Sequence, residues 1–134
     1  MSNVIQFELV SPEEKLISES VYMVEIPGDE GRFGVMNGHC SLLSSLKPGV
    51  VRLFKEQGGE AKEIFIAGGF ADVADGNCTV LAEEAIPVSD LNKESLEQLL
   101  TDLSEDIAMA SEEIDKKHIQ EKIVLTKAKI AAVA

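Results

Sequence analysis

Short runs in which apolar and polar residues alternate fill the first 87 residues. Ile5, Phe7 and Leu9 are each separated by one polar residue, and a period of two is typical of a strand with one buried face. Further strand-like runs lie at residues 15–18, 21–26, 50–55, 63–67, 70–73 and 78–82. Gly, Asp and Asn residues separate many of these runs. Short, closely spaced strands of this kind predict an antiparallel β-sandwich or flattened barrel of about ten strands.

The stretch from residue 27 to residue 49 contains many turn-forming residues. It holds Gly28, Gly31, Gly34, Gly38 and Gly49, with prolines at positions 27 and 48. Glycine admits backbone angles that other residues avoid, and proline fixes φ, so the chain turns repeatedly here. The stretch also carries apolar pieces at 33–36 and 42–43 that favour burial. We interpret it as a shaped surface on a β scaffold; ordinary hairpin loops are an equally good interpretation.

The pattern changes after Pro87, because residues 88–134 contain neither Gly nor Pro. Apolar residues then recur at spacings of three and four, as on one face of an amphipathic helix. These residues are Leu96, Leu99, Leu100, Leu103, Ile107 and Ala110. Ser111 begins a second helix-start signal, and Ile119, Ile123 and Ile130 would line the buried side of a second helix. The prediction is a β-sandwich domain at 1–87 and an antiparallel helical hairpin at 88–134, with a single long helix as the alternative.

Charge narrows the range of partners. The formal net charge of −12 disfavours binding to nucleic acid and to anionic membrane surfaces. No apolar run approaches the roughly 20 residues needed to cross a bilayer, which predicts no direct membrane insertion. Within the helical tail, acidic residues fill the first half and lysines the second. Either an acidic helix lies beside a basic one, or the basic helix meets an acidic partner.

We find no catalytic constellation in the sequence. His39 and Cys40 are adjacent, so an extended chain would point them to opposite faces. Cys40 and Cys78 have no metal-ligand spacing and are expected to be free thiols. No phosphate-binding loop occurs, and we expect neither metal nor cofactor. The alternative function is a small stand-alone enzyme or binding module on a β-sandwich, using His39 with an acid such as Asp29 or Glu30.

Three ordered motifs resemble a known family. Residues 27–49 follow the order P-G-x-E-G-x-F-G-V-x-x-G-H-x-x-L-L-x-x-L-K-P-G, and two later pieces match at 66–73 and 79–83. This order resembles the epsilon subunit of bacterial F-type ATP synthases. The resemblance implies a non-catalytic rotor subunit of the central stalk, which couples rotation of the c-ring to the gamma subunit. It also implies a peripheral location at the cytoplasmic face of the bacterial inner membrane.

The same resemblance implies roles for individual positions. Glu30, Gly31 and Arg32 match the turn that faces the c-ring in that family. Arg32 departs from the pattern, because relatives often carry an acid there, and a cation would reverse the preferred charge of its partner. The matched positions that face the gamma subunit are Ser11, His39 and Ser44.

In some bacterial relatives the helical tail blocks ATP hydrolysis by reaching the alpha and beta catalytic subunits. Lys122, Lys127 and Lys129 are the residues that we expect to make such regulatory contacts with an acidic surface. Other relatives bind ATP on the tail through an Asp-x-x-Arg-Ala element. This tail has no Arg, and residues 90–93 are at most a remnant of the element.

Overall fold

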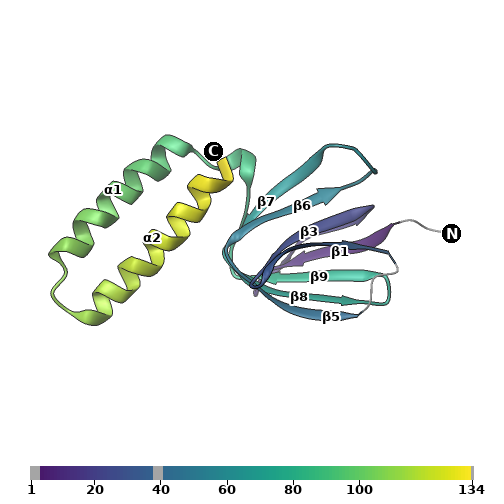
Figure 1. Cartoon of the computed structure of the whole chain (residues 1–134), viewed down its shortest axis with the longest axis horizontal. Helices are drawn as coiled ribbons and strands as arrows, with labels where there is room; N and C mark the ends of the chain where they lie inside the picture. Colours follow the sequence, from purple (N-terminus) through teal and green to yellow (C-terminus); the bar gives the residue numbers. More distant parts are fainter. Residues whose placement is uncertain (1–3, 38–40, 134) are drawn as a thin grey trace. The chain divides into compact units, whose positions relative to one another are not determined.

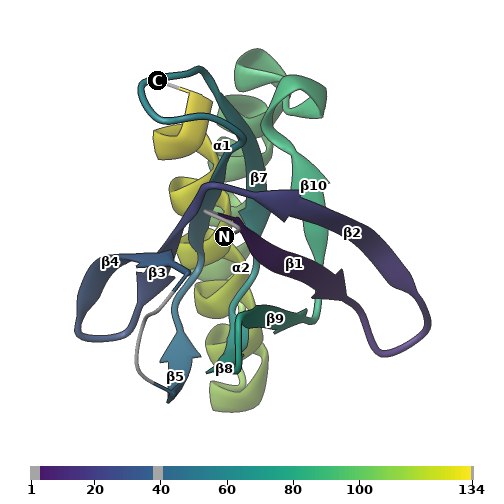
Figure 2. The ribbon, with the colours of Figure 1, turned by 90° about the vertical axis from the view of Figure 1, so that its right-hand side faces the viewer.

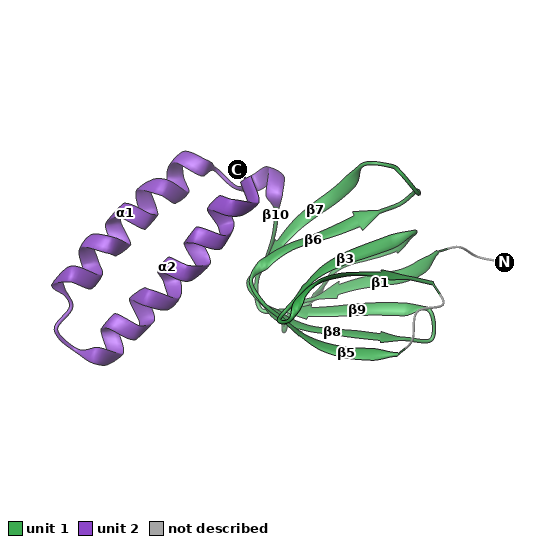
Figure 3. Cartoon of the chain, viewed as in Figure 1, with its two compact units in different colours: residues 1–87 green, residues 88–134 purple. Residues whose placement is uncertain are grey.

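A computed structural model describes residues 4–37 and 41–133 of the chain. The chain divides into two compact units, residues 1–87 and residues 88–134 (Figure 3). The first unit is built from strands and the second from helices (Figure 1).

Over the described residues, ten strands form one sheet in the first unit. The order is β10-β7-β6-β3-β5-β8-β9-β1-β2, and β4 pairs with β3 outside this path. The sheet curls on itself, so that its strands surround a common interior (Figure 2). The strands are β1 (Ile5–Val10), β2 (Lys15–Val21), β3 (Met23–Gly28), β4 (Gly31–Met36), β5 (Leu42–Leu46), β6 (Gly49–Phe54), β7 (Ala61–Ile66), β8 (Gly69–Ala74), β9 (Asn77–Ala82) and β10 (Ala85–Pro87). The predicted fold class is therefore confirmed for this unit.

The core follows the alternation in the sequence. Ile5, Phe7 and Leu9 of β1 are buried, whereas the residues between them are half-buried. The other strands contribute mainly aliphatic side chains to the same cluster, among them Val24, Ile26, Val51, Leu53, Ile64, Ile66, Val73 and Val80. Burial of this apolar surface supplies the main driving force for folding of the unit.

One strand pair departs from the predicted antiparallel pattern. β1 and β9 run parallel, with Phe7 opposite Cys78 and Leu9 opposite Val80. The two strands are separated by more than sixty residues, and hydrophobic periodicity within a strand carries no information about the direction of its neighbour. The predicted antiparallel pairing is therefore wrong for this strand pair, while the predicted fold class holds.

The glycine-rich stretch is more regular than expected. Its first half contains the end of β3 and all of β4, which pair as a hairpin, and its second half contains β5. β4 was not predicted, because Gly31 and Gly34 weaken the strand signal. Pairing along the whole of β3, from Met23 opposite Met36 to Gly28 opposite Gly31, holds β4 in place.

The described part of the second unit contains a short 3₁₀ helix η1 (Val88–Asp90) and two α-helices, α1 (Lys93–Met109) and α2 (Glu113–Val133). The Asn92 side chain accepts a hydrogen bond of 3.0 Å from the Ser95 backbone N–H and caps α1. Ala110 is extended, with φ −70° and ψ 134°, and ends α1. The hairpin is thus confirmed, and the single long helix is wrong. Neither α-helix in the described residues is long and apolar enough to cross a membrane.

The apolar stripe on α1 is narrower than predicted. Leu96 and Leu103 are buried, but Leu99 is 44% exposed. At about 100° per residue, Leu99 lies about 60° round the helix from Leu96, at the edge of the stripe. On α2, Ile123 is buried as expected, while Ile119 and Ile130 are half-buried.

Candidate functional site

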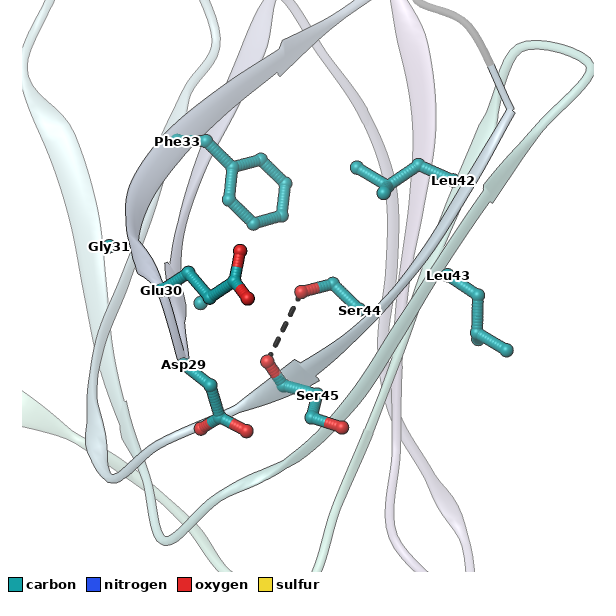
Figure 4. A pocket seen from close by; sticks show the side chains of 9 residues that line it. Asp29, Glu30, Gly31, Phe33, Leu42, Leu43, Ser44 and Ser45 are labelled. Atoms are coloured by element: carbon teal, nitrogen blue, oxygen red, sulfur yellow. Dashed lines mark hydrogen bonds between the residues drawn. The ribbon is translucent and has the colours of Figure 1, made fainter.

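An open crevice of about 450 Å³ lies between the β3–β4 turn and β5 (Figure 4). It brings together Glu30 and Gly31, predicted to face the c-ring, and Ser44, predicted to face the gamma subunit. The resemblance placed these residues at contacts with different subunits, and their sharing of one crevice was not foreseen. The lining residues are Gly28, Asp29, Glu30, Gly31, Phe33, Leu42, Leu43, Ser44 and Ser45.

Backbone hydrogen bonds hold the two sides of the crevice together. The Asp29 N–H donates to the Ser45 carbonyl at 3.0 Å, and the Lys47 N–H donates to the Pro27 carbonyl at 3.0 Å. Close packing at Gly28 keeps the turn tight, because a Cβ there would lie 2.8 Å from both the Gly31 carbonyl oxygen and the Phe33 ring. The turn and β5 therefore form one stiff frame.

The crevice has an apolar side and an acidic side. Phe33 and Leu42 are half-buried and pack against the core. The Glu30 carboxylate points across the crevice toward the Ser44 hydroxyl (Figure 4), and that hydroxyl donates to the Ser45 carbonyl at 3.1 Å. Neither Glu30 nor Asp29 forms an ion pair with another residue that the structure describes.

Arg32 does not neutralise these acids. Its Nε lies 3.7 Å from Glu25 Oε1. The same Glu25 oxygen lies 3.7 Å from Arg52 Nη1, and Arg52 Nε lies 3.0 Å from Glu63 Oε2. These four side chains form a charge ladder across β4, β3, β6 and β7. The Arg52 side chain is half-exposed. The ladder depends on strand register and leaves no local signal in the sequence.

An apolar patch covers the outer face of β5, β8, β9 and β1. We call Val10, Leu43, Phe70 and Leu81 the outer patch; Leu43 is 72%, Phe70 52% and Leu81 46% exposed. Strand register places Phe70 opposite Leu81, and Leu81 opposite Val10. Sequence reasoning missed this patch. The available signal was that these strands carry apolar residues on both faces, which exceeds what one buried face needs.

The remaining predicted contact residues fall in different surroundings. Ser11 serves the β1–β2 turn: its hydroxyl donates to the Glu14 carbonyl and accepts from the Glu14 N–H, both at 3.2 Å. It directly follows Val10 of the outer patch. His39 and Cys40 lie outside the described residues.

The predicted free thiol Cys78 is buried in the core. Burial, with a smaller contribution from the Asp72 carboxylate, raises the pKa of this thiol from 9.0 to about 12. It is therefore protonated at neutral pH and unsuited to nucleophilic attack. Among the described residues, no cluster of His, Cys, Asp and Glu could hold a metal ion.

The predicted regulatory lysines lie on α2. Lys122 and Lys127 are exposed and form no ion pair with any described residue, whereas Lys129 is half-buried. One ion pair lies within α2, between Lys116 and Glu113 at 4.0 Å. Direct pairing with the acidic helix therefore does not account for Lys122 and Lys127.

The comparisons with known proteins agree with one another. Residues 4–88 match the family described as ATP synthase, Delta/Epsilon chain, beta-sandwich domain. The ATP synthase epsilon chain of Rhodospirillum centenum is 41% identical, with 100% of this chain and 94% of that protein aligned. The epsilon chain of Paramagnetospirillum magneticum is also 41% identical, with 100% of both chains aligned.

Solved structures extend the match to three dimensions. A chain in the cryo-EM structure of the Euglena gracilis mitochondrial ATP synthase, comprising OSCP, F1 and c-ring, has a TM-score of 0.87 at 26% identity. The alignment covers 100% of this chain and 84% of that one. A chain in the central stalk and c-ring of the Tetrahymena thermophila mitochondrial ATP synthase shares the fold, with a TM-score of 0.63 at 10% identity and 96% of each chain covered. Full-length similarity in sequence and the matching β-sandwich establish that this chain belongs to the ATP synthase epsilon chain family.

Proposed function

We propose that this chain is the non-catalytic rotor subunit of a proton-translocating F-type ATP synthase, where it couples rotation of the c-ring to the gamma subunit. The observation that carries the proposal is the full-length similarity to ATP synthase epsilon chains. The match to a chain in an assembly of F1 and c-ring supports it. Family membership favours this function over the stand-alone enzyme using His39 with Asp29 or Glu30.

The β unit has the mechanical properties that such a role needs. A rotor part must transmit torque without deforming, and the ten strands of the described residues share one hydrogen-bonded sheet around one core. It must also resist slipping against its neighbours, which calls for an interface of about 1,000 Å² or more. The chemistry of ATP synthesis then takes place in other subunits.

The outer patch is the part of the β unit best suited to the gamma subunit. Its large side chains are apolar and exposed, and such a patch is costly to leave in water. One predicted gamma contact adjoins it in sequence, because Ser11 follows Val10. Ser44 opens into the crevice on the other face of β5, and we assign it to the gamma contact on the strength of the family resemblance alone. We include His39 in the same contact on the strength of the family resemblance.

The c-ring contact is assigned to the β3–β4 turn. Glu30, Gly31 and Arg32 are exposed there, and Gly31 has φ +136°, a conformation that favours glycine. Arg32 shares its charge with Glu25, so the turn presents a partly neutralised cation beside an unneutralised acid. This arrangement suits a ring surface that carries both signs of charge.

The helical unit is assigned a regulatory role toward the catalytic alpha and beta subunits. Lys122 and Lys127 are exposed and without an ion pair among the described residues, so their charges are available to an acidic partner. Lys129 is assigned to the same contact from its position on α2. We place the assembled chain at the cytoplasmic face of the bacterial inner membrane, held there peripherally by other subunits.

Removal of residues 88–134 is expected to raise ATP hydrolysis by the reconstituted complex about fivefold or more, since regulatory coupling energies are typically about 1–3 kcal/mol. The truncated chain should still assemble, because the β unit retains its own core. Steady-state ATPase assays with equal occupancy of the two chains provide the measurement. Unchanged hydrolysis at full occupancy would contradict the regulatory role.

A pull-down from solubilised membranes of the source bacterium tests the proposed function as a whole. A tagged full-length chain is expected to recover the gamma subunit and the c-ring subunit together, identified by mass spectrometry. The control is the same tag on an unrelated acidic β protein, which accounts for non-specific capture. Recovery of neither subunit above this control would refute the assignment.

A further inference from the structure

We propose that the crevice between the β3–β4 turn and β5 receives an arginine side chain from a neighbouring subunit. The inference rests on the proposed function, because it takes the chain to work within an assembly. It adds the chemical identity of the group that one surface recognises. The observations that carry it are the kind of polar atoms in the crevice, the lack of a neutralising partner, and the apolar side wall.

The polar side-chain atoms aimed into the crevice are suited to accept hydrogen bonds. The Glu30 carboxylate has only acceptor oxygens when ionised. The Ser44 hydroxyl donates its hydrogen to the Ser45 carbonyl. The lone pairs of the Ser44 oxygen are therefore free to accept a hydrogen bond. The nearby Asp29 N–H is also committed, to the same carbonyl oxygen. A ligand that matches this set must bring several donors and no acceptor, which describes a cationic side chain.

No described cation of this chain fills that role. Arg32 directly precedes Phe33, which lines the crevice, and successive residues of a strand point to opposite faces, so Arg32 points away from the crevice and pairs with Glu25 instead. Lys47, near the other side of the frame, forms no ion pair with a described residue. The Glu30 and Asp29 charges thus stay available on a chain whose formal net charge is −12. Charge complementarity therefore selects a basic partner.

The apolar wall selects arginine over lysine. A long basic side chain buries its aliphatic stem against apolar surface while its head stays polar, and Phe33 and Leu42 provide such a surface. A planar guanidinium also stacks on aromatic rings and presents donors in a fork. Glu30 and Ser44 offer two acceptors across the crevice from each other (Figure 4). The compact, strongly hydrated ammonium of lysine would neither stack on the Phe33 ring nor present two donors in a fork to Glu30 and Ser44.

Neutralising Glu30 without changing its size tests this contact. The variants are Glu30→Gln and, as a control with the same change in net charge, Glu56→Gln in the exposed turn between β6 and β7. Each full-length chain is titrated onto ATP synthase depleted of its epsilon subunit. Glu30→Gln is expected to weaken binding about tenfold and to lower the salt dependence of binding, whereas Glu56→Gln should stay within about twofold of the unchanged chain. Equal effects of the two variants would overturn the proposal while leaving the proposed function intact.

A second measurement separates the crevice from the assembly. The ¹⁵N-labelled full chain is titrated with N-acetyl-arginine amide, N-acetyl-lysine amide and the neutral isostere N-acetyl-citrulline amide. The chemical-shift changes of the backbone amides at residues 29–31 and 44–45 should be at least about threefold larger with the arginine probe than with either other probe. Equal shifts with the lysine or citrulline probe would overturn the assignment to arginine. Failure of the unchanged chain to bind the depleted enzyme, despite a selective response to the arginine probe, would instead refute the proposed function.

Discussion

Replacement of Gly69 by alanine is expected to lower the free energy of unfolding of the β unit by about 2–6 kcal/mol, the sum of about 1–3 kcal/mol each from backbone strain and from overpacking. Gly69 has φ +146°, which side chains other than hydrogen rarely allow. An added Cβ would overlap the Leu81 carbonyl oxygen and lie 2.9 Å from the carbonyl carbon. These are backbone atoms of the paired strand β9, so they cannot move aside without breaking the sheet.

Urea unfolding followed by tyrosine fluorescence provides the measurement for Gly69→Ala. The chain has one tyrosine and no tryptophan, and Tyr22 lies between β2 and β3, so this signal reports on the β unit. Gly58→Ala is the matched control, because Gly58 has φ +77° and nothing within 4 Å of an added Cβ. Gly58→Ala should lower the free energy of unfolding by only about 1–2 kcal/mol, the cost of a left-handed backbone conformation for alanine. Equal losses in the two variants would show that the contact with Leu81 is relieved without cost.

Replacement of Phe70 by aspartate is expected to weaken binding to epsilon-depleted ATP synthase by about 100-fold or more, because central apolar contacts dominate interface energetics. Phe70 is 52% exposed and lies within the outer patch. In the proposed contact with the gamma subunit, the change removes a large apolar side chain and buries a carboxylate in its place. Stability of the isolated chain should change little, since the side chain already faces water. Binding is measured by titrating the full-length variant onto the depleted enzyme.

Met36→Asp serves as the control for Phe70→Asp. Met36 is 39% exposed, at the end of β4 and outside the outer patch. Met36→Asp therefore introduces the same charge as Phe70→Asp at a comparable exposed apolar position. The affinity of Met36→Asp for the depleted enzyme should remain within about threefold of that of the unchanged chain. If both variants bind equally well, the outer patch is not the gamma-facing surface, and if both bind equally poorly, the effect is one of net charge.

Local patterns in the sequence determined much of this structure. Alternation marked Ile5, Phe7 and Leu9 as core residues, and they are buried. The lack of Gly and Pro after Pro87, with apolar spacings of three and four, indicated the helices. The start signal at Ser111 placed the break between them. Each of these signals depends on residues within a few positions of one another. In a strand or a helix, buried positions recur every two or about every 3.6 residues, so the sequence alone displays the pattern.

The contact surfaces were decided only by the tertiary structure. Glu30 and Ser44 meet in one crevice, and the ladder joins Arg32 to Glu63 through two intervening side chains. The outer patch collects Leu43 and Leu81 from strands far apart in the chain. Such neighbours depend on strand order, register and curl of the sheet, including the parallel pairing of β1 with β9. Hydrogen bonding between strands sets these features, and a backbone that pairs equally well with many partners leaves no periodic trace in the sequence.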